Sequence, residues 1–475
     1  MKRSLSPASL ELRHGMAAML HSLAQLPSRL RHSGLLALPL LLLLSPPGTA
    51  RAANEDPPEI EDWNFHAQAT YVAQKKPSFS AAYSGPNSLS TEAAHSYSFT
   101  STAYLGARLG PATEVYFNPE LVQGLAFSHL AGMGGLTNGE LQKTAGTSPI
   151  VYRARLFLRH TWGLGGGTER VESDANQLAS VYDKRRLTLT AGNLAVTDIF
   201  DDSRHAHDAR TQFLNWSLLT YGAYDFAADS RGYTWGAALD YRHDDEWSLR
   251  AGRFMQPKES NGLPLDRHIF AHYGDQVELE RRYSLNGREG SARLLVFRNV
   301  AVMAGFSDAL AYAQQNGSTP ELAPVRQRRS KVGAGVHVEQ DVADGVGVFA
   351  RLSASDGRSE PYAFTSIDQS FSAGATFEGA RWGRPKDALG VASAVNGLSS
   401  AHRNYLGAGG TDVFLGDGRI RYRPETILES YYRVGFGFGR TDAALSFGLQ
   451  YVRNPGYNAD RGPVKIGTVR LHVEI

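Results

Sequence analysis

The sequence predicts an all-β fold, a transmembrane antiparallel β-barrel of 16 strands, with 18 strands as the alternative. Three observations indicate this fold. Many segments alternate apolar and polar residues, tight turns alternate with long polar connections, and an apolar run near the N-terminus marks the chain for export. In membrane barrels one strand face meets lipid and the other lines the lumen, while periplasmic turns are short and extracellular loops are long.

Residues 1–52 have the pattern of a signal peptide. A basic stretch precedes the apolar run Leu35–Leu44, and the small residues of Ala50–Ala52 suit cleavage by signal peptidase before Ala53. The run has about ten residues, whereas a membrane-spanning helix needs roughly 20. We therefore expect cleavage near Ala52-Ala53 and export of the mature chain to the outer membrane of a Gram-negative cell.

Translation starts at Met1 or at Met16, and the second choice gives a leader of more ordinary length. After the leader, residues 53–61 are expected to form a periplasmic linker and residues 62–475 the barrel. The chain has no cysteine, which excludes disulfides and thiolate metal sites. Removal of the leader leaves 43 basic and 46 acidic residues, a net charge of −3. No net positive field remains, so we expect no nucleic-acid partner.

The first predicted strand, Trp63–Tyr71, shows the alternation most clearly. Its odd positions are aromatic or alanine, and its even positions carry hydrogen-bonding side chains. Successive side chains of a strand point to opposite faces, so one face is apolar and the other polar. About seventeen segments between Trp63 and Ile475 follow this rule, among them residues 102–109, 113–117, 186–191, 233–241, 247–253, 346–352, 434–438 and 443–451.

The connections differ in length. Gly110-Pro111, Asp244-Asp245 and Asp344-Gly345 form tight turns. The long polar connections are Gln74–Ser96, Gln123–Pro149, Gly165–Lys184, Gln256–His272, Tyr312–Arg326 and Ser399–Thr426. Aromatic residues near strand ends fit the interfacial girdles of a membrane barrel: Trp63, Tyr71, Trp162, Trp216, Tyr241, Trp247 and Tyr451.

The alternating segment Thr468–Ile475 predicts how the barrel closes. A closed barrel has no free edge, so its last strand must pair with its first. We expect Thr468–Ile475 to pair with Trp63–Tyr71, with both ends on the periplasmic side. The strand number is then even, which makes 16 or 18 the candidates, and either leaves room for an aqueous channel.

A soluble β-sandwich or propeller is the alternative fold. A sandwich also alternates apolar and polar residues, and a propeller repeats with a fixed blade period. No such period is visible, and the polar strand faces carry too many Arg, Glu, Asp and His residues for a packed interior. The barrel is therefore favoured.

The segment Ala191–Leu239 resembles the carbohydrate-selective porins of the OprB type. The matching elements are Asp198 with Phe200-Asp201, His207-Asp208, Arg210–Phe213, Asn215-Trp216, Gly222-Ala223 and Arg231–Tyr233. Further matches are EVYFNPE (Glu114–Glu120), ARLFLRHTWG (Ala154–Gly163), ALDYRHDDEWSLRAGRF (Ala238–Phe254), ESYYRVGF (Glu429–Phe436) and LQYVRNPGYN (Leu449–Asn458).

This resemblance implies an outer-membrane barrel of about sixteen strands through which sugars diffuse passively. It implies no catalysis and no cofactor, a trimer or a monomer, and contacts with outer-membrane lipid and small polar solutes. A porin for non-carbohydrate anions such as organic acids is an alternative function. A lipase-like barrel enzyme is a remote one, because it needs a Ser–His pair and His160, His243 and His272 have no evident serine partner.

A sugar channel needs a constriction with hydrogen-bonding groups and aromatic faces that bind weakly. The segment Val196–Gln212 is long enough to fold inward and carries many charges. Opposite it, alternation places Arg153, Arg155 and Arg159 on one strand face, and guanidinium groups suit paired hydroxyls or a carboxylate. The predicted constriction and solute-contact residues are Glu114, Tyr116, Arg153, Arg155, Arg159, Asp198, Asp202, Asp208, Arg210, Asp240 and Arg250.

The run His205–Asp208 could in principle bind zinc through two histidines and a carboxylate. The family resemblance already accounts for His207-Asp208, so we expect no metal. Gly165–Gly167 lacks the Lys-Ser/Thr and helix of a phosphate-binding loop and is read as a loop tip.

Overall fold

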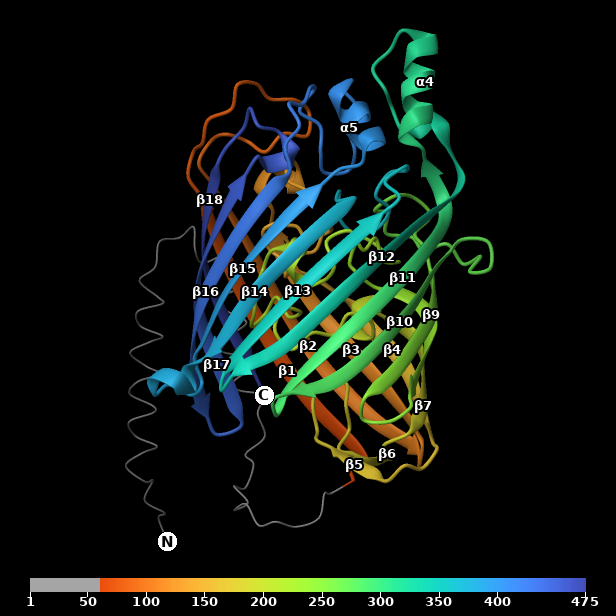
Figure 1. Ribbon diagram of the computed structural model, residues 1–475, viewed down its shortest axis with the longest axis vertical. Coiled ribbons are helices and arrows are strands. Elements are labelled where there is room, and N and C mark those ends of the chain that lie inside the picture. The colour runs from red at the N-terminus through yellow and green to blue at the C-terminus, as the bar shows by residue number, and fades with distance from the viewer. Residues whose placement is uncertain (1–59) are drawn as a thin grey trace. The chain divides into compact units, whose positions relative to one another are not determined.

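The computed structural model describes residues 60–475, which form a closed barrel of 16 antiparallel strands (Figure 1). The predicted signal peptide, its cleavage site and most of the linker lie outside the described residues. The barrel strands are β1 (Trp63–Lys76), β2 (Ala94–Gly110), β3 (Thr113–Leu125), β4 (Ile150–Gly163), β7 (Arg186–Leu194), β8 (Thr234–Arg242), β9 (Trp247–Met255), β10 (Tyr273–Leu285), β11 (Arg288–Ala304), β12 (Arg326–Ala343), β13 (Val346–Ser355), β14 (Gln369–Glu378), β15 (Ala388–Gly397), β16 (Glu425–Phe438), β17 (Thr441–Arg453) and β18 (Val464–Glu474).

A separate hairpin and several short helices complete the described fold. The hairpin strands are β5 (Thr168–Val171) and β6 (Ser180–Asp183), and the α-helices are α3 (Trp216–Leu219), α4 (Phe306–Asn316) and α5 (Ser400–Gly407). Single 3₁₀ turns are η2 (Phe127–Leu130), η3 (Val196–Asp198), η4 (Ala323–Val325), η5 (Gly379–Trp382) and η6 (Pro455–Tyr457). Among residues 60–475, no helix is both long and apolar enough to cross a membrane.

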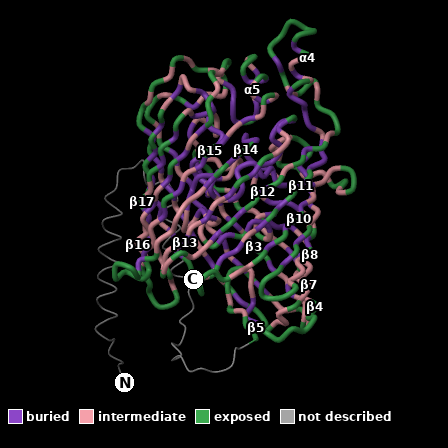
Figure 2. Tube along the Cα trace, in the orientation of Figure 1, coloured by how far each residue is buried: buried purple, intermediate pink, exposed green. Residues whose placement is uncertain are grey.

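More exposed and more buried residues alternate along the strands (Figure 2). On β10 and β11, Leu279 and Leu294 are 40% and 50% exposed on the outer surface, whereas their neighbours Glu278 and Arg293 are buried inside. This is the reverse of a soluble protein, in which charged residues are almost never fully buried unless they are paired. The outer surface therefore matches hydrocarbon, and the predicted membrane-barrel fold is confirmed.

The first and last strands close the barrel, as the sequence predicts. β1 and β18 pair in antiparallel register from Gln68↔Glu474 to Lys75↔Gly467, and Ala67 and Ile475 exchange two further backbone hydrogen bonds of 3.1 and 2.9 Å. The seam thus uses the second half of β1 rather than Trp63–Tyr71. The difference arises because β1 continues past the end of β18, where Trp63 pairs only with Ala107 of β2.

Long loops gather at one end of the barrel and short turns at the other. The long-loop end, at the top of Figure 1, carries α4 and α5, and the turns β10–β11 and β12–β13 at the opposite end have only two residues. By the rule for outer-membrane barrels, the long-loop end is extracellular and the short-turn end periplasmic.

The connection Gly165–Lys184, expected among the long extracellular loops, lies at the periplasmic end. β4 runs toward that end, so the connection to β7 must begin there, and it contains the β5–β6 hairpin. The connection is anchored against the barrel wall. The backbone N–H of Leu178 donates to the Tyr116 hydroxyl at 3.1 Å, and Asn64 donates to the Gln177 carbonyl at 2.7 Å.

Most predicted girdle residues lie on the outer surface, but Trp216 does not. Trp63, Trp162 and Trp247 are exposed on strand faces that meet lipid. Trp216 instead begins α3 inside the barrel, where its indole N–H donates to the Asn138 carbonyl at 2.9 Å. The assignment was wrong because a tryptophan in a non-strand segment cannot be assigned to a face by alternation.

Three extracellular loops are joined by a buried histidine of α5, His402. The ring of His402 contacts Asp368 at 3.0 Å and Asp412 at 2.9 Å, and it stacks on Phe306 of α4 with ring centroids 4.1 Å apart. Burial alone favours the neutral ring, but the two carboxylates raise the pKa of His402 to about 9. The charged histidine therefore holds α4, α5 and the β13–β14 loop together.

Replacing this histidine should loosen the extracellular loops in a pH-dependent way. A pKa raised from 6.5 to about 9 corresponds to roughly 3 kcal/mol of stabilisation. It is fully present below the ordinary pKa and is lost as pH rises through about 9. Limited proteolysis should show His402→Ala cut faster than wild type at pH 7, with the two converging above pH 9. His268→Ala, in an exposed loop beside Asp266, is the control. Equal cleavage of wild type and His402→Ala at pH 7 would contradict this account.

Candidate functional site

The longest internal feature of the barrel is the connection between β7 and β8, residues 195–233, here called the inward segment. It contains η3 and α3 and lies within the lumen, bonded to side chains from several strands. Its apolar side chains Phe200, Phe213 and Leu218 are completely buried. A segment that buries such groups inside an otherwise polar lumen provides the barrel with its own core.

Glycines of the barrel wall make room for the inward segment. A Cβ on Gly347 of β13 would lie 1.9 Å from the His205 ring, and one on Gly335 of β12 would lie 2.6 Å from the Tyr221 ring. At both positions a side chain larger than that of glycine would clash with the ring of the inward segment. The wall is therefore shaped to receive specific side chains of the segment.

Charged side chains of the wall hold the backbone of the inward segment. Arg351 of β13 donates to the carbonyl oxygens of Leu218 and Ala206 at 2.9 and 2.8 Å. Arg470 of β18 donates in the same way to Ala209 and Gln212, each at 2.7 Å. A fold inside a barrel has no sheet partner, so side chains must satisfy its backbone groups.

Asp201 is the central anchor of this arrangement. Its carboxylate contacts His337 at 2.8 Å and the Arg351 guanidinium at 3.0 Å, and all three side chains are almost fully buried. Burial favours the neutral acid, yet Arg351 and His337 hold the pKa of Asp201 well below its usual range. The aspartate therefore stays ionised and ties the segment to β12 and β13.

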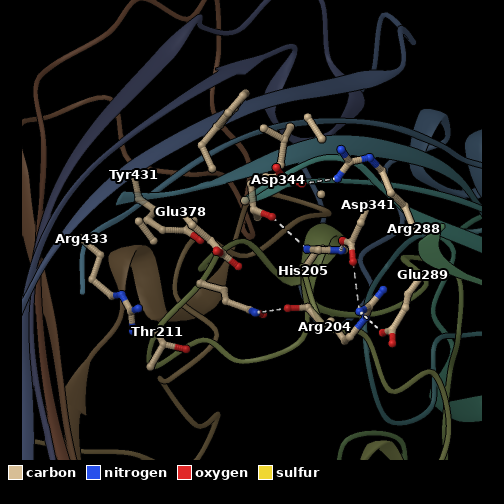
Figure 3. A pocket seen from close by; sticks show the side chains of 18 of the residues that line it. Arg204, His205, Thr211, Arg288, Glu289, Asp341, Asp344, Glu378, Tyr431 and Arg433 are labelled. Atoms are coloured by element: carbon tan, nitrogen blue, oxygen red, sulfur yellow. Dashed lines mark hydrogen bonds and ion pairs between the residues drawn. The ribbon is translucent and has the colours of Figure 1, made fainter. Parts of the chain in front are cut away.

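On one side of the inward segment lies a cavity of about 510 Å³ that opens among the periplasmic turns (Figure 3). Arg204 and His205 face Asp341 across it at 3.3 and 3.4 Å. The His205 ring also contacts the Thr376 hydroxyl at 2.9 Å. This side cavity shares no lining residue with the cavities described below.

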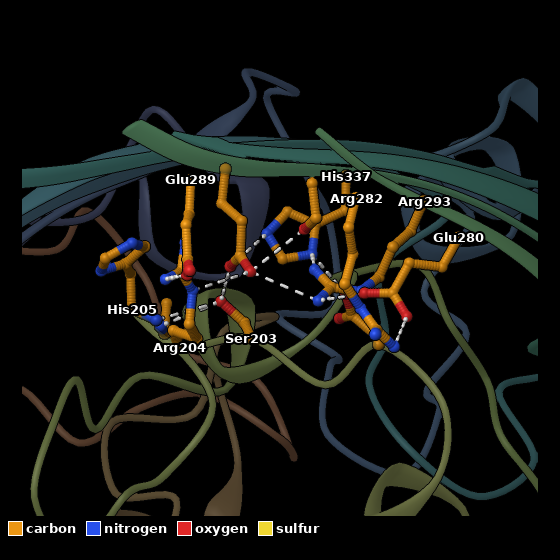
Figure 4. A network of polar contacts seen from close by, with 12 residues as sticks. Ser203, Arg204, His205, Glu280, Arg282, Glu289, Arg293 and His337 are labelled. Carbon is orange, nitrogen blue, oxygen red and sulfur yellow. Dashed lines mark hydrogen bonds and ion pairs between the residues drawn. The ribbon is translucent and has the colours of Figure 1, made fainter. Parts of the chain in front are cut away.

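A polar network joins the segment to β10, β11 and β12 (Figure 4). Ser203 donates to Glu339 at 2.9 Å, and Arg293 reaches Glu339 at 3.3 Å and Glu280 at 2.9 Å. Arg282 continues the chain to Glu280 at 3.2 Å. These charges pair with one another and with Ser203, so they fasten the inward segment to this part of the wall.

A cavity of about 270 Å³, here called the upper chamber, is lined mostly by the inward segment itself and by Arg155 of β4. It is lined by the loop residues 139–143, by Arg155 and by aromatic side chains, namely Trp216, Phe226, Tyr233 and Phe364. Four residues of its lining have a buried polar atom without a hydrogen-bond partner in the protein: Gln142 Oε1, Arg155 Nη1, His207 Nδ1 and Arg231 Nε. The chamber thus combines aromatic planes with unused donors and acceptors.

Lys143 adds a titratable charge to the upper chamber. Its ammonium group donates to the Ala363 carbonyl at 2.7 Å and lies 5.5 Å from the Trp216 ring centroid. Burial lowers the pKa of Lys143 to about 7, although Asp225 and Asp229 act in the opposite direction. The charge of the chamber therefore changes near neutral pH.

A second cavity of about 330 Å³, the lower chamber, lies toward the periplasmic end. Strands β4, β7, β8, β9 and β10 and the β5–β6 hairpin contribute to it. Its charged lining residues are five arginines and three aspartates: Arg159, Arg186, Arg242, Arg250, Arg282, Asp198, Asp202 and Asp240. Four of these arginines are paired with glutamates, Arg186 and Arg242 with Glu169 and Arg250 and Arg282 with Glu280, so ion pairs line most of this chamber.

Asp198 lines both chambers and so marks the place where they meet. Arg155 donates to both of its carboxylate oxygens, each at 2.7 Å, and the guanidinium lies over the Tyr233 ring at 5.2 Å. Arg155 holds the pKa of Asp198 below its usual range, against the effect of burial. This charged pair stands between the upper and lower chambers.

The structure places eight of the eleven predicted site residues around the two chambers. Arg155, Asp198, Asp208 and Arg210 line the upper one, and Arg159, Asp198, Asp202, Asp240 and Arg250 line the lower one. Arg210 does not face an open lumen freely. It is paired with Glu140 at 2.7 Å and Glu120 at 3.2 Å.

Glu114 and Tyr116 face the lumen but are buried beneath the hairpin connection. Glu114 is paired with Arg108 at 3.2 Å and accepts from the hydroxyls of Tyr116 and Tyr182 at 2.7 and 2.6 Å. Neither residue lines the upper or the lower chamber. The two residues therefore hold the β4–β7 connection in place, and they do not contact a solute in either chamber.

Arg153 lies on the outer surface, contrary to the prediction. A β-bulge at Ala154 lets Asn118 pair with Arg155 and Pro119 with Arg153, which reverses the alternation. Arg153 therefore packs against the outward-facing Trp235, 5.1 Å from its ring centroid, and Tyr152 faces the lumen in its place. The position of this β-bulge could not be predicted from a single sequence.

Sequence reasoning missed several residues of the chambers. Arg186 and Arg242 stand at lumenal positions of strands and could have been found by extending the alternation. Lys143, Arg231 and Phe364 come from three different loops, and no pattern in the sequence brings these loops together. Among residues 60–475, no group of three His, Cys, Asp or Glu side chains is arranged to hold a metal.

A closed sixteen-stranded barrel with an apolar outer surface and a charged, partly filled lumen is the architecture of an outer-membrane porin. Residues 87–475 match the family model of the carbohydrate-selective porins. The chain belongs to the carbohydrate-selective porin family, OprB, and is thus an outer-membrane channel for carbohydrates.

The chain is similar to several solved structures. OprB of Pseudomonas putida, in its high-pH structure, has a TM-score of 0.65 and 16% sequence identity, covering 87% of this chain and 94% of that one. The outer-membrane channel DcaP of Acinetobacter baumannii has a TM-score of 0.44 and 10% identity, covering 87% and 96%. OccK5 (OpdH) of Pseudomonas aeruginosa has a TM-score of 0.42 and 12% identity, covering 88% and 98%. No curated protein matches the chain in sequence.

Removing the Asp201 anchor should loosen the inward segment. In Asp201→Ala the buried Arg351 loses its charged partner, and breaking a buried pair from one side costs about 3–5 kcal/mol. We expect a lower thermal stability and a larger, noisier single-channel current in planar bilayers. Asp202→Ala, at the exposed neighbouring position, should keep the wild-type stability and a steady current. A wild-type melting temperature and quiet channels in Asp201→Ala would show that Asp201 does not anchor the segment.

Proposed function

We propose that sugars and similar small polar solutes pass through the upper chamber, past the Arg155–Asp198 pair, and into the lower chamber. One observation carries this proposal: the upper chamber sets polar side chains, such as Arg155, Asp208 and Arg231, beside aromatic planes. Hydroxyl groups of a sugar can hydrogen-bond to such side chains, and the CH face of the ring can pack on the aromatic planes. Such contacts are weak enough to let the solute leave.

The Arg155–Asp198 pair supports selection for polar neutral solutes. A bidentate ion pair presents separated charges but little net charge. A hydroxylated solute can exchange hydrogen bonds with both partners, whereas an apolar solute would only desolvate them. We propose that the pair forms the narrowest polar contact along the route, together with Asp208, Arg159, Asp240 and Arg250.

The lower chamber supports a second candidate function, the passage of small organic anions. Arg159 lines this chamber without a carboxylate partner among residues 60–475, and guanidinium groups bind carboxylates. Reversal potentials across a salt gradient separate the two functions. Strong anion preference without any block by sugars would favour the second.

Four further expectations complete the proposal. The mature protein is released by cleavage near Ala53, contacts outer-membrane lipid along its apolar outer surface, and works as a monomer or a homotrimer without catalysing a reaction. The rings of His160, His243 and His272 contact Thr113, Tyr241 and Asp266 rather than a serine. These contacts support a channel over a lipase-like enzyme.

Neutralising one partner of the central pair should weaken sugar binding. In planar bilayers, sugars should reduce the wild-type current. Asp198→Asn should weaken this block about tenfold, since a hydrogen bond to a charged group contributes roughly 1.5–3 kcal/mol. Because Arg155 is then unneutralised, Asp198→Asn should also shift selectivity toward anions.

The outer surface offers a matched control for this experiment. Asp275 of β10 accepts from Arg253 of β9 with the same bidentate geometry, 2.7 Å for each contact, but it faces lipid. Asp275→Asn should leave sugar block and selectivity at wild-type values. Liposome swelling with mono- and disaccharides should follow the same order. Equal sugar block in Asp198→Asn and wild type would reject the proposed route.

A further inference from the structure

The outer surface carries a groove of about 600 Å³ at the extracellular ends of β15, β16 and β17. Val395, Thr426 and Arg453 lie at paired positions across these three strands and face outward. Above them, the upper wall of the groove is formed by Arg421, Arg423, Pro424, Ala459, Arg461, Gly462 and Pro463. The groove therefore lies outside the channel, on the surface that meets the outer leaflet.

The charge of this groove is one-sided. Its lining contains four arginines, Arg421, Arg423, Arg453 and Arg461, and no aspartate or glutamate. Two of these arginines already have partners within the protein. Arg421 pairs with Asp460 at 2.6 Å, and the buried Arg461 donates to backbone carbonyls of the β1–β2 loop.

Arg423 and Arg453 remain. Both are exposed, and within residues 60–475 neither guanidinium has a hydrogen-bond or ion-pair partner. Elsewhere on the outer surface Arg253 is neutralised by Asp275 and Arg281 lies 4.0 Å from Glu246, whereas Arg153 packs on the Trp235 ring without a carboxylate partner among residues 60–475. Two unneutralised guanidinium groups in one groove are a site for an anion with several oxygens, because the planar forks match phosphate.

An apolar surface continues directly below the groove. Leu428, Leu449 and Tyr451 face outward on β16 and β17 and are 49%, 54% and 37% exposed. Lys465 of β18 pairs with Tyr451 in register and adds a further outward-facing charge at this height. The surface thus presents cations above and apolar side chains below. This arrangement is complementary to a lipid, whose anionic head group would lie at the cations and whose acyl chains would lie along the apolar side chains.

We propose that this groove binds a phosphorylated glycolipid of the outer leaflet. Its phosphates contact Arg423 and Arg453, its sugar head fills the groove against Val395 and Pro463, and its acyl chains lie along Leu428 and Leu449. The lipid would hold the β15–β18 wall at a defined height in the membrane. This site is separate from the solute route, since the groove shares no lining residue with the two chambers.

The test uses the full chain purified in detergent, with binding followed by native mass spectrometry. Three probes are compared: a bisphosphorylated lipid A-type glycolipid, the same glycolipid after removal of its phosphates, and inorganic phosphate. The wild-type protein should bind the first probe at least tenfold more tightly than either of the others. The double variant Arg423→Ala/Arg453→Ala should lose this preference.

Arg281→Ala is the matched control, because Arg281 is also an exposed outward-facing arginine but lies at the periplasmic end of β10. It should bind all three probes as the wild type does. Heat-modifiable migration on gels checks that each variant is folded. The phosphate-removal comparison is made on the wild-type protein, so it decides the question even if the double variant fails to fold.

Several results would overturn the proposal. Equal binding of the two glycolipids by the wild type would remove the role of the arginines, and equal binding of inorganic phosphate would remove the role of the lipid. Unchanged glycolipid binding by the double variant would place the lipid elsewhere. If the double variant changed only the oligomeric mass, the groove would be an interface between copies of this chain.

Discussion

Backbone hydrogen bonding in lipid is the constraint on which the rest of this structure depends. A bilayer offers no partners for N–H and C=O groups, so every strand must have a neighbour on both sides. Here the requirement is met by β1 and β18, which close a sheet of sixteen strands. Closure then determines that one face of each strand meets lipid and that the other faces a lumen.

The lumen imposes a second requirement on the chain. A barrel of this size encloses more space than the wall side chains alone can fill. The inward segment occupies much of that space, and it is held by wall charges such as Arg351 and Arg470 that bond to its backbone. The buried charges of the wall are thus structural on one side of the lumen and line the solute route on the other.

The Arg155–Asp198 pair shows how these two roles meet. Asp198 belongs to η3 of the inward segment, and Arg155 belongs to the wall strand β4. Their contact fastens the start of the segment and also separates the upper chamber from the lower one. On the outer surface, Arg423 and Arg453 face outward, and among residues 60–475 neither has a carboxylate partner.

Strand alternation, tight turns and a leader-like N-terminus by themselves determined the fold class, the closure of the barrel and the lumenal side of most charged residues. These are local properties, since the face of a strand residue depends only on its position in a period of two. Only the tertiary structure decided that Arg153 faces outward, that Trp216 lies in the lumen and that the β5–β6 connection lies at the periplasmic end. The same holds for the chambers, because Lys143, Arg231 and Phe364 meet only after three separate loops fold into one barrel.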